Sequence, residues 1–363
     1  MAKQNPIKRI FELYTSDLSY QEIERLVKRD AAEVYEFFAS EIPKPDPSQN
    51  KLTRSLIFIR SLFNAFLLKL TAARRIFYLI SLIFGFIGIV NNHDGYVVLA
   101  FLIINALLAF ELADKLTSKN EIDLARRIQN ELMPKNPPEN SFYEISAFYE
   151  SAKEVGGDYF DVIPAGKNKE DSILVIGDIS GKGMAAALYM VRVQAIVHSL
   201  VKTTSDAKEI IINLKNTFSE KLLPEYFLTL ITASIKNDGS ISMCKAGHPP
   251  VLHYKKASNE IETINMKGMG IGLNDKGIFE KIIEEKTIQP SSGDVLLFYT
   301  DGITEAMNNF KAEFGTDRLK RVLEENANLS PNEIKQKIIK AVYNFRGDTP
   351  QFDDITLIVL KAK

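Results

Sequence analysis

Cysteine is almost absent from this chain, since Cys244 is the single cysteine among 363 residues. This excludes an internal disulfide and any cysteine-rich zinc site, and the alternating stretch SISMCKAG predicts that Cys244 packs within a strand. The four histidines are scattered and show no HExxH or other paired ligand spacing. The formal net charge is only −1, so we expect no nucleic-acid partner.

The sequence also lacks a secretory signal and a complete nucleotide-binding loop. The N-terminal sequence MAKQNPIKRIFELY has no apolar run before a cleavage site, so we expect the N-terminus to stay in the cytosol. The segment Gly181-Lys182-Gly183 lacks the full GxxxxGK[ST] pattern of a phosphate-binding loop, which argues against a nucleotide function. Its glycines are better explained as a turn that leads the chain into a helix.

Uncharged apolar runs are present at 76–90 and 96–110, with the polar turn NNHDG between them. Each is shorter than the roughly 17–25 residues of a typical span, so a buried helical hairpin of a soluble domain is an alternative. Both runs are apolar on every face, however, and residues 51–75 carry Lys and Arg but no acidic residue. Such a basic block favours the cytoplasmic side of a membrane. The sequence therefore predicts a two-helix transmembrane hairpin with both ends in the cytoplasm.

The charge distribution divides the chain into four segments. We expect an N-terminal helical cytosolic region over 1–70, the transmembrane hairpin over 74–112, a linker or regulatory helix over 113–139 and an α+β domain over 140–363. The basic stretch at 52–70 is also compatible with an amphipathic helix in the membrane interface.

The linker has an apolar residue at multiples of four positions and ends at Pro134. These residues are Leu112, Leu116, Leu124, Ile128 and Leu132. The spacing is not a strict heptad, so the helix suits packing on the following domain as well as on its own copy. A homodimer through this helix, a signal relay and a plain spacer all remain open.

Residues 140–363 show strand-like runs with helical patterns between them. The expected strands are YEISAFYE, DYFDVIPA, DSILVIGDI, FLTLITASI, SISMCKAG, KIIEEKTI, DVLLFYT and DITLIVLKA. The expected helices cover about 183–203, 206–222, 316–325 and 331–345. Because the first two helices follow one another between the third and fourth strands, we expect an antiparallel arrangement with segregated helices rather than a doubly wound parallel sheet.

Aspartates recur at the ends of these strands. Asp158 lies in VGGDYFD, Asp178 ends SILVIGD, Asp301 follows VLLFYT, and Asp353 and Asp354 open DDITLIVL. A carboxylate at the edge of a buried strand is unfavourable unless it is paired or bound to a metal. One such residue is usually a turn or cap, but four junctions of this kind indicate a carboxylate cluster that binds hard divalent cations.

These residues carry a resemblance to a known family. The ordered segments SAKEVGGDYFDV, VIGDISGKGMAAAL, KAGHPP, LLFYTDGITEA, FGTDRL and DDITLIVL resemble the PPM-type metal-dependent protein serine/threonine phosphatases, in particular the bacterial SpoIIE-like sporulation and stress-response branch. The segment ARRIQNELMPKNPP resembles the regulatory linker helix of that branch. The resemblance implies a β-sandwich of antiparallel sheets flanked by helices, with two or more Mn²⁺ or Mg²⁺ ions at one end.

The resemblance also assigns roles. Asp178 would bridge two metals, the Ile179 carbonyl would bind one, and Asp301 and Asp353 would complete the ligands. Asp158 would bind directly or through water. Asp354 would lie behind the ligands, and Lys153 would face the phosphate or else be an exposed lysine.

The implied reaction is hydrolysis of phosphoserine or phosphothreonine by a metal-activated water, without a covalent intermediate. The absence of a Cys-x5-Arg motif agrees with this. Where eukaryotic relatives have a histidine, this chain has Ser180, and His248 is interpreted as a turn residue, so the leaving-group acid is unassigned.

The implied substrate is a phosphorylated regulatory protein, typically an anti-sigma-factor antagonist, in bacterial signal transduction. The alternatives are a membrane-anchored signalling scaffold with a phosphatase-like fold and a phosphohydrolase for small molecules. The four retained aspartates argue against the scaffold.

Overall fold

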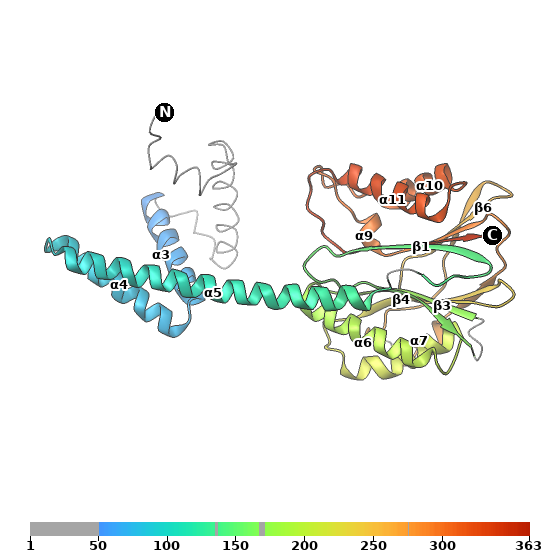
Figure 1. Cartoon of the computed structure of the whole chain (residues 1–363), viewed down its shortest axis with the longest axis horizontal. Coiled ribbons are helices and arrows are strands. Elements are labelled where there is room, and N and C mark those ends of the chain that lie inside the picture. The colour runs from blue at the N-terminus through green and yellow to red at the C-terminus, as the bar shows by residue number, and fades with distance from the viewer. Residues whose placement is uncertain (1–50, 135–136, 167–170, 275) are drawn as a thin grey trace, which may run out of the picture. The chain divides into compact units, whose positions relative to one another are not determined.

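A computed structural model of the chain describes residues 51–134, 137–166, 171–274 and 276–363, with side chains from residue 57 onward (Figure 1). The part of the predicted N-terminal helical region that covers residues 1–50 lies outside the described residues. The chain divides into two compact units between Thr117 and Ser118. Each unit is described by itself.

The first unit contains the apolar helices. α3 spans Lys51–Lys69, α4 spans Ala72–Val90 and α5 spans Asp94–Leu132. The predicted boundary between the second apolar run and the linker falls inside α5, because the sequence has no proline or glycine between Gly95 and Pro134 to end the helix. α4 and α5 are each long and apolar enough to cross a membrane. That finding rests on length and composition alone.

α4 and α5 pack closely near their connecting turn. A Cβ added at Gly88 would lie 2.7 Å from Val97 Cγ2, so only glycine allows this approach of the two helices. The rings of Phe84 and Tyr96 stack 5.8 Å apart. Most other apolar side chains of the pair are exposed, for example Phe86 and Phe101. So much exposed apolar surface is unusual for a soluble protein.

The second unit contains two five-stranded antiparallel sheets, which confirms the predicted fold class. One sheet has the order β1-β10-β9-β6-β7, and the other has the order β2-β3-β4-β5-β8. The strands of the first sheet are β1 (Tyr143–Glu150), β6 (Val251–Lys255), β7 (Glu260–Ile264), β9 (Val295–Tyr299) and β10 (Ile355–Ala362). Those of the second are β2 (Tyr159–Ala165), β3 (Asp171–Ile179), β4 (Leu228–Ile235), β5 (Ile241–Ala246) and β8 (Glu285–Ile288).

Helices cover the outer face of each sheet (Figure 1). α6 (Met184–Leu200) and α7 (Ala207–Phe218) pack on the second sheet, and the 3-10 turn η1 (Ser219–Lys221) follows them. α10 (Gly315–Asn326) and α11 (Pro331–Arg346) pack on the first sheet. The sequence signal for α11 is strong, since Ser330 and Glu333 form a reciprocal capping box before Pro331.

The layered arrangement explains why the central strands are apolar throughout. On β9, Leu296 and Phe298 face the core between the sheets, while Val295, Leu297 and Tyr299 face α10 and α11. Because both faces are buried, the strand reads as a continuous apolar run instead of an alternating one. The end of such a strand is therefore a poor place for a charge.

One local prediction differs from the structure, and two elements of the structure were not predicted. The predicted strand KIIEEKTI (281–288) is wrong in its first half, because α8 (Phe279–Ile282) occupies it and only β8 is extended. The hairpin of β6 and β7 was not predicted; its turn places Asn259 at φ 54°, a conformation that asparagine tolerates. The short helix α9 (Asp301–Thr304) was also missed.

Candidate functional site

The four strand-end aspartates lie at one end of the sandwich. Asp158 precedes β2 and Asp178 lies near the end of β3, both in the second sheet, whereas Asp301 follows β9 and Asp353 precedes β10, both in the first. The two sheets meet through Thr300, whose Oγ1 donates a hydrogen bond to Asp158 Oδ2 over 2.9 Å. The chain therefore brings together four carboxylates that are far apart in sequence.

Asp158 is the most deeply buried of the four, at 1% exposure. Its Oδ2 accepts hydrogen bonds from the hydroxyls of Thr300 and Thr356, at the ends of β9 and β10. Burial and the nearby charges of Asp178 and Asp354 raise the pKa of Asp158 well above its ordinary value, against the effect of the two hydroxyls. Two donors do not satisfy a buried carboxylate, so this residue is set up to share its charge with a cation.

The pKa of Asp178 is also strongly raised. Burial, followed by the charges of Asp301 and Asp353, raises its pKa to about 7. Asp301 responds in the same way, since burial and the charge of Asp353 raise its pKa, partly offset by the N–H of Gly302 and by Lys182. Each carboxylate thus raises the pKa of its neighbours, and the repulsion among them is relieved either by a bound proton or by a cation.

Asp353 already has one cation beside it. Lys182 Nζ lies 2.8 Å from Asp353 Oδ2 and also donates a hydrogen bond to the carbonyl oxygen of Phe352. Both side chains remain partly open to solvent, at 39% and 32% exposure. Lys182 was interpreted from the sequence as part of a turn, and its contact with the carboxylates was not predicted.

Asp354 supports the loop that carries Asp158. Its Oδ1 accepts from the N–H of Ala152 over 2.7 Å, and its Oδ2 accepts from the N–H of Gly157 over 2.6 Å and of Asp158 over 3.4 Å. Both oxygens are therefore occupied by backbone donors. This geometry suits a residue that orders the loop from behind the other carboxylates.

The two glycines before Asp158 are required by close packing. A Cβ at Gly156 would lie 2.3 Å from Asp354 Oδ2, and one at Gly157 would lie 2.9 Å from the carbonyl oxygen of Ile179. The Ile179 N–H also donates to the Gly157 carbonyl over 3.3 Å. The Ile179 carbonyl is thus held against the glycine loop, next to Asp178.

Three other residues from the sequence reading have clear places. Lys153 is exposed on the loop before Gly156. Ser180 is tied to the backbone, because its Oγ accepts from the N–H of Phe227 over 2.8 Å. His248 is 2% exposed, and its Nδ1 lies 2.9 Å from Thr229 Oγ1. Burial and Lys245 lower the pKa of His248 to about 3, so it stays neutral.

Sequence reasoning missed several supporting residues. Thr300 and Thr356 hold Asp158, and Gln129 of α5 binds the backbone of Gly156. The hydroxyl of Tyr149 is buried without a hydrogen-bond partner in the described part of the chain, beside Gly156. Neither threonine has a motif of its own, but each flanks a predicted aspartate by one or two positions.

The donor set fits a hard divalent cation by its chemistry. All the side-chain donors are carboxylate oxygens, which Mn²⁺ and Mg²⁺ prefer, and burial together with their mutual repulsion raises the pKa of Asp158, Asp178 and Asp301. Within the described residues, no three acidic, histidine or cysteine side chains converge closely enough to hold an ion unaided. An ion here would therefore need the Ile179 carbonyl, water or movement of Asp353 away from Lys182.

Comparison with known proteins identifies a family and several relatives that are similar to this chain. The profile of the family Stage II sporulation protein E (SpoIIE) matches residues 168–363, more than half of the chain. The phosphoserine phosphatase RsbU of Bacillus subtilis is 28% identical over 251 residues, which cover 68% of this chain and 71% of RsbU. Protein IcfG of Synechocystis is 27% identical over 286 residues, which cover 71% of this chain and 44% of IcfG.

A solved structure shares the fold. The PP2C phosphatase domain of SpoIIE from Bacillus subtilis, with a fragment of its regulatory domain, has a TM-score of 0.52 at 20% identity. The match covers 62% of this chain and 64% of that one. The chain thus spans less than two thirds of IcfG and of the SpoIIE fragment.

Proposed function

Because this chain belongs to the SpoIIE family of PP2C-type protein phosphatases, we propose that residues 140–363 hydrolyse phosphoserine or phosphothreonine on a regulatory protein. The observation that supports this most is the carboxylate cluster. Asp158, Asp178, Asp301 and Asp353 come from both sheets to one end of the sandwich, where burial and mutual repulsion raise the pKa of Asp178 to about 7. A fold keeps such a costly arrangement when it is used for chemistry.

The cofactors in this proposal are two or more Mn²⁺ or Mg²⁺ ions. Asp178 would hold both ions, the Ile179 carbonyl, Asp301 and Asp353 would complete the ligands, and Asp158 would bind directly or through water. The ions would supply a water nucleophile at neutral pH and offset the charge of the phosphoryl oxygens. The burial of Asp158 and the hydrogen bonds that it accepts from Thr300 and Thr356 would hold its carboxylate in one orientation for the ions.

The remaining residues in this proposal orient the metal ligands or supply positive charge near the phosphate. Thr300 and Thr356 fix the orientation of Asp158, and Asp354 fixes the backbone of the loop that carries it. The ammonium of Lys182, within 2.8 Å of Asp353, would attract a phosphate dianion, and Lys153, exposed on the loop before Gly156, would add a second positive charge. The buried neutral His248 and the backbone-bonded Ser180 are poorly placed as leaving-group acids.

The substrate in this proposal is a phosphoprotein of a bacterial signalling system, such as an anti-sigma-factor antagonist. The relative RsbU is a phosphoserine phosphatase. α4 and the first part of α5 would anchor the protein in the cytoplasmic membrane as a hairpin, with the catalytic domain in the cytoplasm. The length, composition and exposed apolar side chains of the two helices support this.

Phosphate release by the full chain in detergent tests the proposal. The substrates are a phosphoserine peptide and p-nitrophenyl phosphate, each with and without Mn²⁺, and the variants are Asp178→Asn and Asp301→Asn. Asp348→Asn is the matched control, because Asp348 is an exposed aspartate close in sequence to Asp353 but outside the cluster. We expect Mn²⁺-dependent turnover that both cluster variants abolish and the control retains. No turnover at saturating Mn²⁺, with no Mn²⁺ binding by calorimetry, would favour the scaffold.

A further inference from the structure

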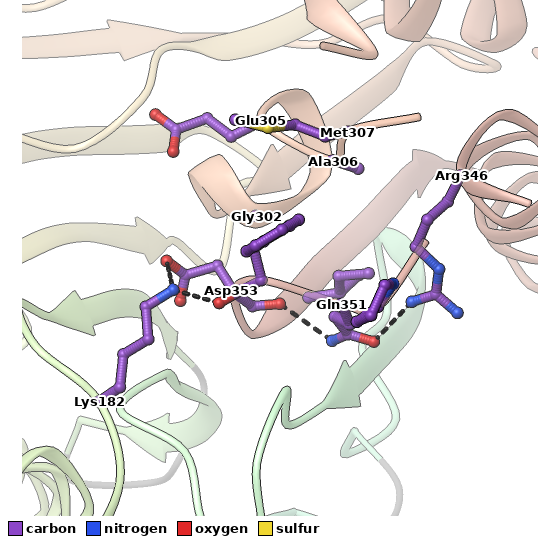
Figure 2. Close-up of a pocket in the computed structure, with 11 residues that line it drawn as sticks. Lys182, Gly302, Glu305, Ala306, Met307, Arg346, Gln351 and Asp353 are labelled. Atoms are coloured by element: carbon purple, nitrogen blue, oxygen red, sulfur yellow. Dashed lines mark hydrogen bonds and ion pairs between the residues drawn. The ribbon is translucent and has the colours of Figure 1, made fainter. Parts of the chain in front are cut away.

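A small cavity opens beside the carboxylate cluster (Figure 2). Its volume is about 140 Å³, and it begins at Asp353 and Gly302, next to Asp301. Apolar side chains of Ala306, Met307 and Phe352 form much of its wall. Its position means that a substrate whose phosphoryl group lies at the carboxylates would place a neighbouring residue here.

Arg346 lies at the far end of this cavity from Lys182 (Figure 2). Its Nη1 donates to Gln351 Oε1 over 3.0 Å, and its guanidinium lies over the ring of Tyr343 at 5.1 Å. Its Nε is buried and has no hydrogen-bond partner in the described residues. No ion pair within the described ranges joins Arg346 to an acidic side chain, in contrast to Lys182, which is paired with Asp353.

The negative groups of the cavity lie away from Arg346. Asp353 is held by Lys182, and in Figure 2 the carboxylate of Glu305 points away from the guanidinium. The Arg346 end therefore combines a half-buried positive charge, without an ion-pair partner among the described residues, with an apolar wall. A guanidinium in such surroundings favours a carboxylate, which it binds through two parallel hydrogen bonds.

We propose that this cavity is a specificity subsite that binds a glutamate side chain close to the phosphoserine of the substrate, with its methylene groups on Phe352 and Met307 and its carboxylate on Arg346. The proposal rests on the proposed phosphatase function and defines its substrate class further, as phosphoserine with an acidic residue nearby. A glutamate fits better than an aspartate, because the apolar wall separates Arg346 from the carboxylates.

The exposed aromatic residues around the cavity suit a protein substrate. Phe352 is 56% exposed at the cavity wall. Phe310 is 89% exposed on a neighbouring turn, and that turn is joined to the segment before the cavity by a hydrogen bond of 2.6 Å from Thr349 Oγ1 to Asn309 Oδ1. Exposed aromatic rings around a charged pocket are common anchors in protein interfaces.

The alternative role for Arg346 is to support the backbone of the cavity rather than to bind the substrate. Gln351 Nε2 donates to the carbonyl oxygen of Asp353 over 3.0 Å, so Arg346, Gln351 and Asp353 form a chain of hydrogen bonds. Arg346 would then only steady the backbone next to Asp353. Removing Gln351 separates the two roles, because Gln351→Leu breaks this chain but leaves the guanidinium in the cavity.

The test uses phosphoserine peptides that carry Glu, Gln or Lys at one position, scanned over the residues on either side of the phosphoserine. With the full chain, we expect one position at which the Glu peptide has a kcat/KM about tenfold above the Gln peptide, the effect of one charge-assisted contact. Arg346→Gln removes this ratio, and Arg346→Glu reverses it in favour of Lys. Gln351→Leu retains the preference for Glu.

Two results would overturn the subsite. One is the absence of a preference for Glu at every scanned position. The other is an equal loss by Arg346→Gln on all peptides and on p-nitrophenyl phosphate, reproduced by Gln351→Leu. Fluorescence anisotropy with the same labelled peptides gives a readout that needs no turnover: tighter binding of the Glu peptide, reversed in Arg346→Glu, supports the subsite even if hydrolysis fails, and equal binding contradicts it.

Discussion

The side-chain amide of Gln129 forms two hydrogen bonds with the backbone of Gly156. Nε2 donates to the Gly156 carbonyl over 2.7 Å, and Oε1 accepts from the Gly156 N–H over 3.0 Å. Gln129 is 3% exposed and lies close to the C-terminal end of α5. The end of the linker helix is therefore connected through a single residue to the loop that carries Asp158.

The first prediction concerns this contact. We expect Gln129→Ala to leave two buried backbone groups without partners, which costs on the order of 1–3 kcal/mol per group and loosens the loop before Asp158. The expected result is a higher Mn²⁺ concentration for half-maximal phosphatase activity, with a lower Tm. Asn130→Ala is the matched control, since Asn130 is exposed on the same turn of helix. Equal Mn²⁺ dependence of the two variants would contradict the prediction.

The second prediction concerns pH. The pKa of Asp178 is raised from 3.8 to about 7, so between these pH values the folded, metal-free protein binds more protons than the unfolded chain. Its free energy of unfolding must then fall as pH rises through this range. We expect metal-free protein to melt at a higher temperature at pH 5 than at pH 7.5. Thermal unfolding with a chelator present measures this directly.

Asp178→Asn provides the matched variant for the pH experiment. The amide cannot ionise, so we expect the metal-free variant to have a higher Tm than the wild type at pH 7.5, by about 2–4 °C per kcal/mol, and a shallower dependence on pH. The same variant should lack Mn²⁺-dependent activity. A variant with the wild-type pH slope would show that another group, such as Asp158, dominates the titration.

The third prediction concerns Asp354. Asp354→Asn keeps the size of the side chain but replaces one acceptor oxygen by an NH₂ group, which cannot accept from both Ala152 and Gly157. We expect about a 10–100-fold loss of metal affinity or activity, the usual cost of changing a residue that orients metal ligands. Isothermal titration with Mn²⁺ measures the affinity. Asp348→Asn, at an exposed aspartate in the same segment, should bind like the wild type.

Strong local signals explain why most of the fold was predictable. β9 and β10 are long apolar runs because both faces of their sheet are covered, and α11 has a complete capping box at Ser330. β6 and β7 were missed because the polar turn around Asn259 resembles a surface loop in sequence. The first half of the predicted strand at 281–288 was wrong because a short stretch with apolar residues at Ile282 and Ile283 does not distinguish α8 from a strand, whereas its second half is β8.

The site was predictable only in part, for a physical reason. Aspartates at strand ends can be recognised from the sequence, because burying a charge at the end of an apolar strand is energetically unfavourable without a specific partner. Thr300, Thr356 and Gln129 act through contacts with residues far away in sequence, and no local pattern distinguishes them from other polar residues. The contact of Lys182 with Asp353 also depends on how the two sheets meet. Such contacts become visible only in three dimensions.

The fourth prediction concerns the membrane hairpin. The native Cys244 is fully buried among apolar side chains, so a Cys244→Ala background gives a cysteine-free chain without burying a new polar group. In that background we expect Asn92→Cys, in the turn between α4 and α5, to react with a membrane-impermeant maleimide in intact bacterial cells. Ser118→Cys, beyond the hairpin, should react only after lysis. Reaction of both cysteines only after lysis would contradict the proposed topology.

The last prediction concerns the apolar stripe of the linker. Leu124 and Ile128 are 58% and 54% exposed on α5, although Met133 and Gln129 of the same segment are buried against the catalytic domain. A stripe left uncovered after the helix has packed on its own domain is available to a second copy of the chain. We expect the full chain to be a dimer in detergent by light scattering, and Leu124→Lys combined with Ile128→Lys to make it a monomer with the same helix content. Lysine at the exposed polar positions Ser118 and Asn130, which lie off the stripe, is the control, and it should leave the dimer intact. A monomeric wild-type chain at all accessible concentrations would instead mean that the stripe is covered by a different partner or by lipid.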